Sequence, residues 1–263
     1  MDGGILVTEQ MLAESGPALR EAAGGLPLVV LGAAGAAGDP AGVSVAYFSG
    51  DLYPARTREF AFALAKARAL RWLHSFSAGV DHPWFGQLVA RGIRVTHSSG
   101  ASAVPIAHTV MLYLLALSRD LRGWEEARSR RAWEPHDVVD LQGQRLGVLG
   151  MGPIGRSVAG LGMAFGMETV GLTRRPRGDE PCETWPLSRL DALLARTDWL
   201  VLALPLTDET RGILSAARLA CLPPGARLVN VGRGDLVDEA ALVAALRSGR
   251  LAGAGLDVFA TEP

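Results

Sequence analysis

Short apolar runs alternate with amphipathic stretches along the first hundred residues. The runs have the length of strands, and the stretches between them carry apolar positions at helical spacing. Strands that alternate with helices are typical of a parallel, doubly wound α/β sheet. The predicted strands cover residues 5–7, 28–31, 43–48, 70–76 and 93–96, and the predicted helices cover 9–23, 56–69 and 83–91.

The same alternation returns in the second part of the chain, after two helical segments. Residues 104–120 are strongly apolar, which predicts a helix buried against a second domain or a partner subunit. Residues 122–137, rich in Arg, Glu and Trp, predict a more exposed helix and loop. The strands predicted after them cover 146–149, 168–173, 198–203, 227–231 and 251–258, with helices at 157–165 and 187–195 and one starting within 237–242.

A polar, glycine-ended segment at 96–100 separates the two parts and predicts a domain crossing. With 263 residues and 49% hydrophobic content, the chain is long enough for two modest cores. We therefore expect two domains, one over residues 1–100 and one over residues 101–263.

A glycine-rich motif follows the predicted strand at 146–149. Gly150, Gly152 and Gly155 lie between that strand and the predicted helix. Glycine permits the tight turn and lets the backbone approach a pyrophosphate at the helix N-terminus, and the third glycine lets helix and strand pack closely. Pro153 fits the first helical turn, where its missing N–H group costs nothing. This context favours a dinucleotide site over an ordinary glycine-rich turn.

Two arginines stand where a NAD site carries an acid. An Asp or Glu about 20 residues after the first glycine holds the ribose 2′-hydroxyl of NAD, whereas Arg174 and Arg175 follow the predicted strand 168–173. A guanidinium offers a planar fork of donors suited to a phosphate. The sequence therefore predicts NADP as the cofactor, with NAD as the second choice. The alternative interpretation is a solvated arginine-rich loop.

The charge balance argues against nucleic-acid binding, and the cysteines argue against a disulfide framework or a metal site. The chain carries 26 Lys and Arg against 27 Asp and Glu, which gives no basic footprint for a nucleic acid. No apolar run is long enough to span a bilayer, and the chain does not open on a basic segment that leads into an apolar one, so we expect a cytoplasmic protein without membrane contact. Cys182 and Cys221 have no CxxC spacing, so neither a disulfide framework nor a metal site is expected.

A tight turn at 77–81 follows the predicted strand 70–76. Ligands of open α/β sheets bind in crevices at the carboxyl ends of strands. The backbone N–H groups of Ala78, Gly79 and Val80 could therefore hold a small carboxylate. An ordinary strand-to-helix turn is the equally simple alternative.

Motifs at residues 150–155, 202–210, 230–239 and 255–263 form a specific combination, with weaker motifs at 77–81 and 99–107. Together they resemble the D-isomer-specific 2-hydroxyacid dehydrogenase family, in its glyoxylate/hydroxypyruvate reductase branch. The resemblance implies two doubly wound parallel-sheet domains, a flavodoxin-like substrate-binding domain over residues 1–100 and a Rossmann dinucleotide-binding domain over residues 101–263. It also implies a homodimer that forms through the helices after the crossing.

The resemblance assigns roles to two charged residues. In such enzymes an Arg at the position of Arg233 binds the carboxylate and keto oxygen of the substrate, where a forked cation stabilises the charge that develops during hydride transfer. A Glu at the position of Glu262 pairs with a catalytic His and raises its pKa, so that the imidazolium can donate a proton. The alternatives are a loop cap for Arg233 and a solvated acid for Glu262.

The same resemblance implies further contacts with cofactor and substrate. Asp257 would hold the nicotinamide carboxamide. The substrate contacts would come from the backbone of Ala78, Gly79 and Val80. The implied cofactor contacts are Pro153, Ile154, Arg174, Pro205, Thr210, Val231 and Asp257.

The chain departs from the family pattern at two places. His108 stands where the family usually has Glu. The family also continues beyond the position of Glu262 to the catalytic His and to a final helix that returns to the first domain. The five histidines present are expected to be structural, with His82 the nearest to the predicted carboxylate turn, so the proton donor is expected beyond Pro263.

These observations predict an enzyme that uses NADPH to reduce a small 2-oxo acid, of the glyoxylate or hydroxypyruvate type, to the D-2-hydroxy acid. If the chain ends before the catalytic His, the alternative is an NADP-binding sensor or corepressor-like module without turnover. Oxidation of formate or phosphite ranks lower, because the extra site residues that it needs are not found.

Overall fold

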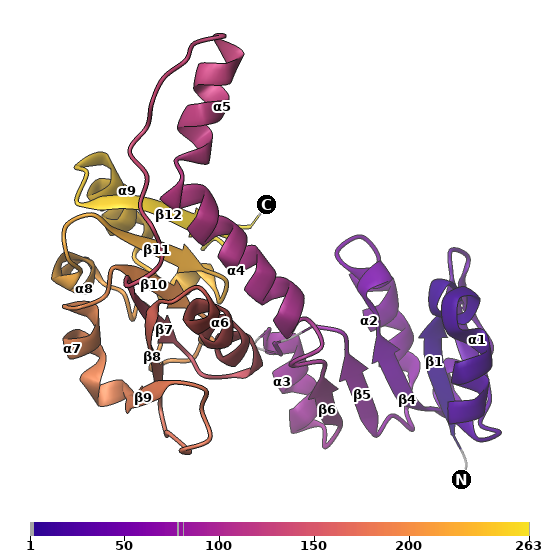
Figure 1. The fold of residues 1–263 in the computed structure, drawn as a ribbon. Coiled ribbons are helices and arrows are strands. Elements are labelled where there is room, and N and C mark those ends of the chain that lie inside the picture. Colours follow the sequence, from indigo (N-terminus) through magenta and orange to yellow (C-terminus); the bar gives the residue numbers. More distant parts are fainter. Residues whose placement is uncertain (1–2, 78, 81, 263) are drawn as a thin grey trace. The chain divides into compact units, whose positions relative to one another are not determined.

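The structure, a computed structural model, describes residues 3–77, 79–80 and 82–262. The chain divides into two compact units, Met1–Ala101 and Ser102–Pro263. Over the described residues, each unit is built on one six-stranded sheet (Figure 1). The predicted α/β class with a Rossmann domain is confirmed, with one exception in the first sheet.

The first sheet has the predicted parallel strands and one addition, an antiparallel strand, β3, at its edge. β3 pairs antiparallel with β2, with Leu31 opposite Ala36, and Gly35 at a φ of 103° closes the turn between them. The sequence pattern missed β3 because its residues are Gly and Ala, which lack the β-branched and aromatic side chains typical of strands. The other strands are parallel and follow the flavodoxin-like order. The sheet order is β3-β2-β1-β4-β5-β6, built from β1 (Gly4–Thr8), β2 (Leu28–Gly32), β3 (Gly35–Ala37), β4 (Val43–Phe48), β5 (Trp72–Ser75) and β6 (Arg94–His97).

Three α-helices of the first unit pack their apolar faces on this sheet. They are α1 (Glu9–Ala23), α2 (Thr57–Lys66) and α3 (Pro83–Ala90). Phe60 and Leu64 of α2 are buried in one core with Leu6 of β1 and Leu73 of β5. The helix predicted at 56–69 ends early, because the N–H group of Ala67 bonds to the carbonyl of Leu64 instead of continuing the helical ladder.

The second sheet is entirely parallel, and its strand order is that of the Rossmann fold. Counted from β7, the order across the sheet is 6-5-4-1-2-3. β9 is an edge strand that the sequence pattern missed, because its four residues contain no continuous apolar run. The sheet order is β12-β11-β10-β7-β8-β9, built from β7 (Arg145–Leu149), β8 (Glu168–Thr173), β9 (Glu183–Pro186), β10 (Trp199–Leu202), β11 (Ala226–Asn230) and β12 (Leu251–Leu256).

The strand order of this sheet reverses between β7 and β10. The two strands pair in parallel, with Leu149 opposite Leu202 at their carboxyl ends. In open α/β sheets, ligands bind outside the carboxyl ends of the strands at such a switch point. The segments that begin at Gly150 and Ala203 therefore lie where a cofactor is expected.

α4 covers part of the second sheet, and its side chains lie very close to the backbone of β12. It lies against β12 and α6, and two glycines of β12 make the approach possible. A Cβ atom added to Gly253 would lie 2.7 Å from the side chain of Leu117, and one added to Gly255 would lie 2.5 Å from the ring of Tyr113. The helices of this unit are α4 (Ala103–Ser118), α5 (Leu121–Ser129), α6 (Pro153–Ala164), α7 (Leu190–Leu194), α8 (Ala216–Cys221) and α9 (Glu239–Arg247).

The other face of α4 is apolar but exposed. Ala107, Val110 and Leu114 are fully buried, whereas Leu112 is 60% exposed. Within the described ranges, no single helix has the length and apolar content needed to cross a bilayer. α4 and α5 have the required length and apolar content only when they are taken together, and the pair is bent by 61°. The buried core helix of a soluble protein can meet the same criteria.

Candidate cofactor and substrate site

The glycine turn after β7 is closed by two backbone contacts that only glycine permits. Gly150 has a φ of 102°, and a Cβ atom at this position would lie 2.6 Å from the carbonyl oxygen of Ala203. A Cβ atom at Gly155 would lie 1.7 Å from the carbonyl oxygen of Gly150. At Gly152 the same construction meets no atom within 4 Å. Two of the three glycines therefore hold strand, turn and helix together, and the middle one leaves open space at the start of α6.

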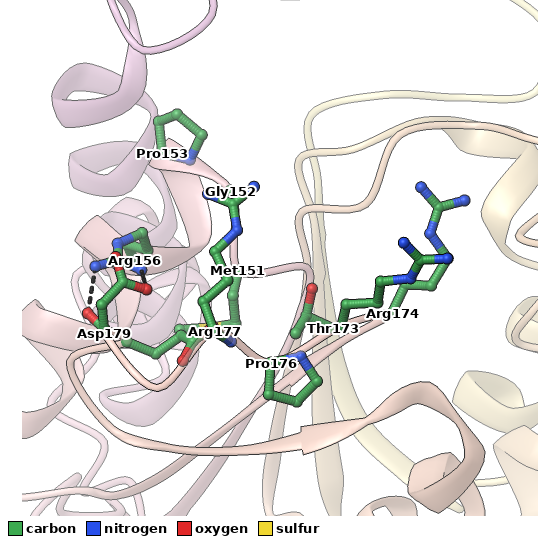
Figure 2. A pocket seen from close by; sticks show the side chains of 11 residues that line it. Met151, Gly152, Pro153, Arg156, Thr173, Arg174, Pro176, Arg177 and Asp179 are labelled. Carbon is green, nitrogen blue, oxygen red and sulfur yellow. Dashed lines mark hydrogen bonds and ion pairs between the residues drawn. The ribbon is translucent and has the colours of Figure 1, made fainter.

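A pocket of about 850 Å³ opens beside this turn (Figure 2). One side comes from the turn and the first residues of α6, and the other from the segment that follows β8. Four of the lining residues are arginines. The predicted residues Gly152, Pro153, Arg174 and Arg175 are thus brought together at one pocket. The lining residues are Met151, Gly152, Pro153, Arg156, Thr173, Arg174, Arg175, Pro176, Arg177, Asp179 and Glu180.

Internal contacts shape the segment after β8. The backbone N–H groups of Arg177 and Gly178 each donate to the Glu180 carboxylate at 2.8 Å. These hydrogen bonds, first of all the one from Arg177, hold the pKa of the Glu180 carboxyl below its usual value. Arg156 of α6 lies 3.2 Å from an Asp179 carboxylate oxygen and also donates to the Asp179 carbonyl. The two acids of this segment are therefore occupied with its own backbone and with α6.

Arg174 is the most weakly held of the pocket arginines that form an ion pair. Its side chain is 74% exposed and lies 3.8 Å from Glu209, which is itself exposed. A solvent-exposed pair of this kind contributes about 0–1 kcal/mol. Arg174 can therefore exchange this partner for a phosphate at little cost.

The segments after β10, β11 and β12 begin side by side. The N–H group of Val231 bonds to the Leu202 carbonyl at 3.1 Å, and that of Asp257 bonds to the Asn230 carbonyl at 3.0 Å. After β10, Pro205 is exposed, whereas the Thr210 hydroxyl is buried and bonds to the Pro205 carbonyl and the Thr207 N–H group at 2.8 Å each. Thr210 therefore fixes the shape of the segment that carries Pro205.

Arg233 is carried by a segment that its neighbours hold on both sides. The buried amide of Asn230 donates to the Arg233 carbonyl at 2.8 Å and accepts from the Gly232 N–H group at 3.0 Å. A Cβ atom at Gly232 would lie 2.8 Å from the Leu204 carbonyl oxygen, and one at Gly234 would lie 1.9 Å from the backbone of Phe259. Asn230 and the two glycines thus position the partly buried Arg233, whose guanidinium also donates to the Gly232 carbonyl at 2.7 Å.

The predicted residues after β11 and β12 differ in what their side chains can reach. Val231 is only 7% exposed and packs in the core, so a cofactor could contact only its backbone. Asp257 is exposed. Glu262 is exposed and accepts a hydrogen bond from the Phe259 N–H group at 2.8 Å. Among the described residues, no contact joins Glu262 to a histidine.

The predicted carboxylate turn belongs to the first unit. Ala78 lies outside the described residues. The Ser77 hydroxyl donates to the Gly79 carbonyl at 2.7 Å, and Val80 packs against the core of that unit. His82, the next described residue, accepts from the Trp84 N–H group at 3.2 Å and caps α3.

The other histidines take structural or exposed positions. His74 bonds to the hydroxyl groups of Thr96 and Ser98 at 2.8 and 3.1 Å. His136 lies 2.6 Å from a carboxylate oxygen of Asp120, next to the start of α5. His97 and His108 are exposed.

The structure adds residues that the sequence did not single out. Arg156, Asp179 and Glu180 line the pocket, and Asn230 braces the Arg233 segment. For Asn230 a signal was available, since an amide at the end of an apolar strand needs partners when it is buried. Arg156 follows Gly155 directly, but its pairing with Asp179 depends on how the segment after β8 folds.

The residues present fit a dinucleotide that carries phosphate groups. The open space at Gly152 lets a ligand approach the backbone at the start of α6. Guanidinium groups supply the charge and the forked donors that phosphate oxygens accept. At the end of β8, where a NAD site carries an Asp or Glu, this chain carries Arg174 and Arg175.

Comparison with known proteins agrees with this geometry. The family described as "D-isomer specific 2-hydroxyacid dehydrogenase, NAD binding domain" matches residues 111–263. A glyoxylate reductase from Thermococcus gammatolerans is 36% identical over 211 residues, which cover 75% of this chain and 62% of that reductase. The match thus spans less than two thirds of that relative.

Solved structures extend the likeness over the whole chain. A D-isomer specific 2-hydroxyacid dehydrogenase from Xanthobacter autotrophicus, in complex with NADPH and MES, is 33% identical with a TM-score of 0.80, covering 100% of this chain and 82% of that one. An NADPH-dependent glyoxylate/hydroxypyruvate reductase from Sinorhizobium meliloti, in complex with NADP and sulfate, is 30% identical with a TM-score of 0.77, covering 100% and 83%. The predicted family is confirmed, and this chain belongs to the D-isomer-specific 2-hydroxyacid dehydrogenases.

Proposed function

We propose that this protein binds NADP and uses NADPH to reduce a small 2-oxo acid of the glyoxylate or hydroxypyruvate class to the D-2-hydroxy acid. The observation that carries the proposal is the arginine-lined pocket beside the glycine turn, with Arg174 and Arg175 at the end of β8. The names of two similar proteins, an NADPH-dependent glyoxylate/hydroxypyruvate reductase and a glyoxylate reductase, support the substrate class.

The chemistry divides between the cofactor and this chain's own residues. When bound, the cofactor supplies the hydride that reaches the keto carbon. Arg233 orients the substrate carboxylate and stabilises the negative charge that builds up on the keto oxygen as its π bond to carbon breaks. A histidine paired with Glu262 would give that oxygen its proton, and none of the described histidines contacts Glu262. Asn230 keeps Arg233 in place for this role.

Turnover of the natural protein tests the activity directly. We expect NADPH oxidation with glyoxylate and hydroxypyruvate, and one D-2-hydroxy acid formed for each NADPH consumed. NADPH binding without oxidation by any 2-oxo acid tested would contradict the proposed reaction. It would favour a module that only binds the cofactor.

Exchanging the two arginines after β8 should change the cofactor preference. In the double variant Arg174→Asp and Arg175→Ser, the new acid repels the 2′-phosphate and can accept from the ribose 2′-hydroxyl of NADH. A hydrogen bond to a charged group contributes about 1.5–3 kcal/mol, which is roughly 10- to 100-fold in affinity. We expect the ratio of NADPH to NADH affinity to fall by at least about 100-fold, measured as the two dissociation constants by titration.

Arg247→Ser is the matched control, because Arg247 is an exposed arginine of α9 that does not line the pocket. It should leave both dissociation constants unchanged. An unaltered NADPH to NADH ratio in the double variant would refute the assignment of NADP.

We also propose that the protein is a homodimer whose interface includes α4 and α5. Exposed apolar side chains, which usually mark an interaction site when they gather on one face, recur along both helices.

The Leu112→Glu variant should shift the mass in solution from dimer to monomer, because it places a charge in the contact. Val243→Glu, at an exposed apolar position of α9, should leave the dimer intact, and a monomeric wild type would disprove the proposal. The exposed residues are Val104, Leu112, Leu115, Leu121 and Trp124.

A further inference from the structure

The start of α6 offers few donors for the diphosphate of a dinucleotide. Pro153 is the first residue of the helix and has no N–H group. The N–H group of Arg156 already bonds to the Gly152 carbonyl at 2.9 Å. In the first helical turn this leaves the N–H groups of Ile154 and Gly155 for two phosphates that each carry a negative charge. A cation near Gly152 would therefore add much to binding.

Two arginines line the pocket near the glycine turn, and one of them already has an acidic partner. Arg156 is held by the carboxylate and the carbonyl of Asp179. Arg177 forms no ion pair within the described ranges of the chain, and it lines the same pocket as Met151 and Gly152. In Figure 2 its side chain runs along Met151 in the direction of Gly152, whereas Arg174 lies on the opposite side, beyond Thr173.

The backbone that carries Arg177 is held at two points. The Arg177 N–H group donates to Glu180, and Asp179 joins the same segment to α6 through Arg156. Gly178, at a φ of 84°, makes the turn between these two anchors. Arg177 therefore extends from a fixed backbone, which lowers the entropy that this segment loses when it binds a ligand.

We propose that Arg177 binds the diphosphate of the cofactor, while Arg174 and Arg175 bind the 2′-phosphate. The assignment deepens the proposed function at the same pocket and separates two anion positions within it. Arg177 would then contribute equally to NADP and NAD binding, and only the pair after β8 would discriminate between them.

Two small ligands distinguish these positions without any turnover. ADP carries the 5′-diphosphate alone, and adenosine 2′-monophosphate carries the 2′-phosphate alone. We expect Arg177→Gln to weaken ADP binding about tenfold, as for one lost charge-assisted hydrogen bond, and to leave adenosine 2′-monophosphate binding unchanged, both measured by calorimetric titration. Arg175→Ser should show the reverse pattern, and Arg177→Lys should restore part of the ADP affinity.

The outcomes separate this inference from the proposed cofactor preference. Unchanged ADP binding in Arg177→Gln would overturn the inference. An equal loss of both ligands would overturn it too, because the substitution would then act by disturbing the whole segment. If the wild type fails to bind adenosine 2′-monophosphate while ADP binding still depends on Arg177, the inference stands and the NADP preference fails.

Discussion

Replacing Arg233 with alanine is expected to lower kcat/KM for glyoxylate and hydroxypyruvate by at least about 100-fold. Loss of one donor to a developing oxyanion costs about 10²–10³ in kcat in well-studied enzymes, and Arg233 is proposed to hold the substrate carboxylate as well. The cofactor should still bind, because its pocket lies beside the glycine turn and does not include Arg233. Steady-state NADPH oxidation and a separate NADPH titration measure the two quantities.

Two further variants sharpen this test. Arg233→Lys keeps the charge but loses the forked donors, so we expect partial recovery of kcat/KM. Arg247→Ala removes an exposed arginine of α9 and should have no effect. Near-normal turnover in Arg233→Ala would remove Arg233 from the mechanism, and an equal loss of NADPH binding would show that the residue supports the fold instead.

Replacing Gly155 with alanine is expected to destabilise the second unit and to weaken NADPH binding. The added methyl group would lie 1.7 Å from the carbonyl oxygen of Gly150, and both groups belong to backbone that cannot rotate away. α6 must then move off the turn, and overpacking of this kind costs about 1–3 kcal/mol. For a chain of this size, we expect a fall in Tm of roughly 2–12 °C.

Gly160→Ala is the matched control, because Gly160 lies in the same helix and a Cβ atom there meets nothing within 4 Å. Alanine should stabilise that position by about 0.5–1 kcal/mol through its better helix propensity. The two variants are thus expected to shift Tm in opposite directions. Equal Tm values would contradict the close packing of α6 on the glycine turn.

The glycine turn and the central strands of the second unit could be predicted from sequence because their signals are local. Leu146 and Val148 belong to a short apolar run, and the glycines that follow it have few other uses in that position. β3 and β9 could not be predicted, since the sequence Gly-Ala-Ala of β3 and the sequence Glu-Thr-Trp-Pro of β9 contain no apolar run of this length. Whether these segments form strands depends on the neighbouring strand with which they pair, β2 for β3 and β8 for β9.

In the candidate site too, residues with a local sequence signal could be predicted, and contacts between separate elements could not. Arg174 and Arg175 were predicted from their distance to the first glycine, which depends only on the strand and helix between them. The Arg156–Asp179 pair joins two separate elements, and the bonds from Arg177 and Gly178 to Glu180 depend on how one loop turns. A linear pattern contains no information of that kind. Asn230 could have been inferred, since a buried amide must be hydrogen-bonded.

The glycines of β12 have a consequence for how the protein is made. α4 packs on Gly253 and Gly255, yet more than a hundred residues are synthesised between this helix and that strand. At about 5–20 residues per second, the ribosome needs roughly 7–28 seconds to deliver the surface that covers Tyr113 and Leu117. During that time the side of α4 that packs on β12 stays uncovered in the nascent chain. A chaperone that recognises exposed apolar segments would therefore find a binding site on α4 until β12 is made.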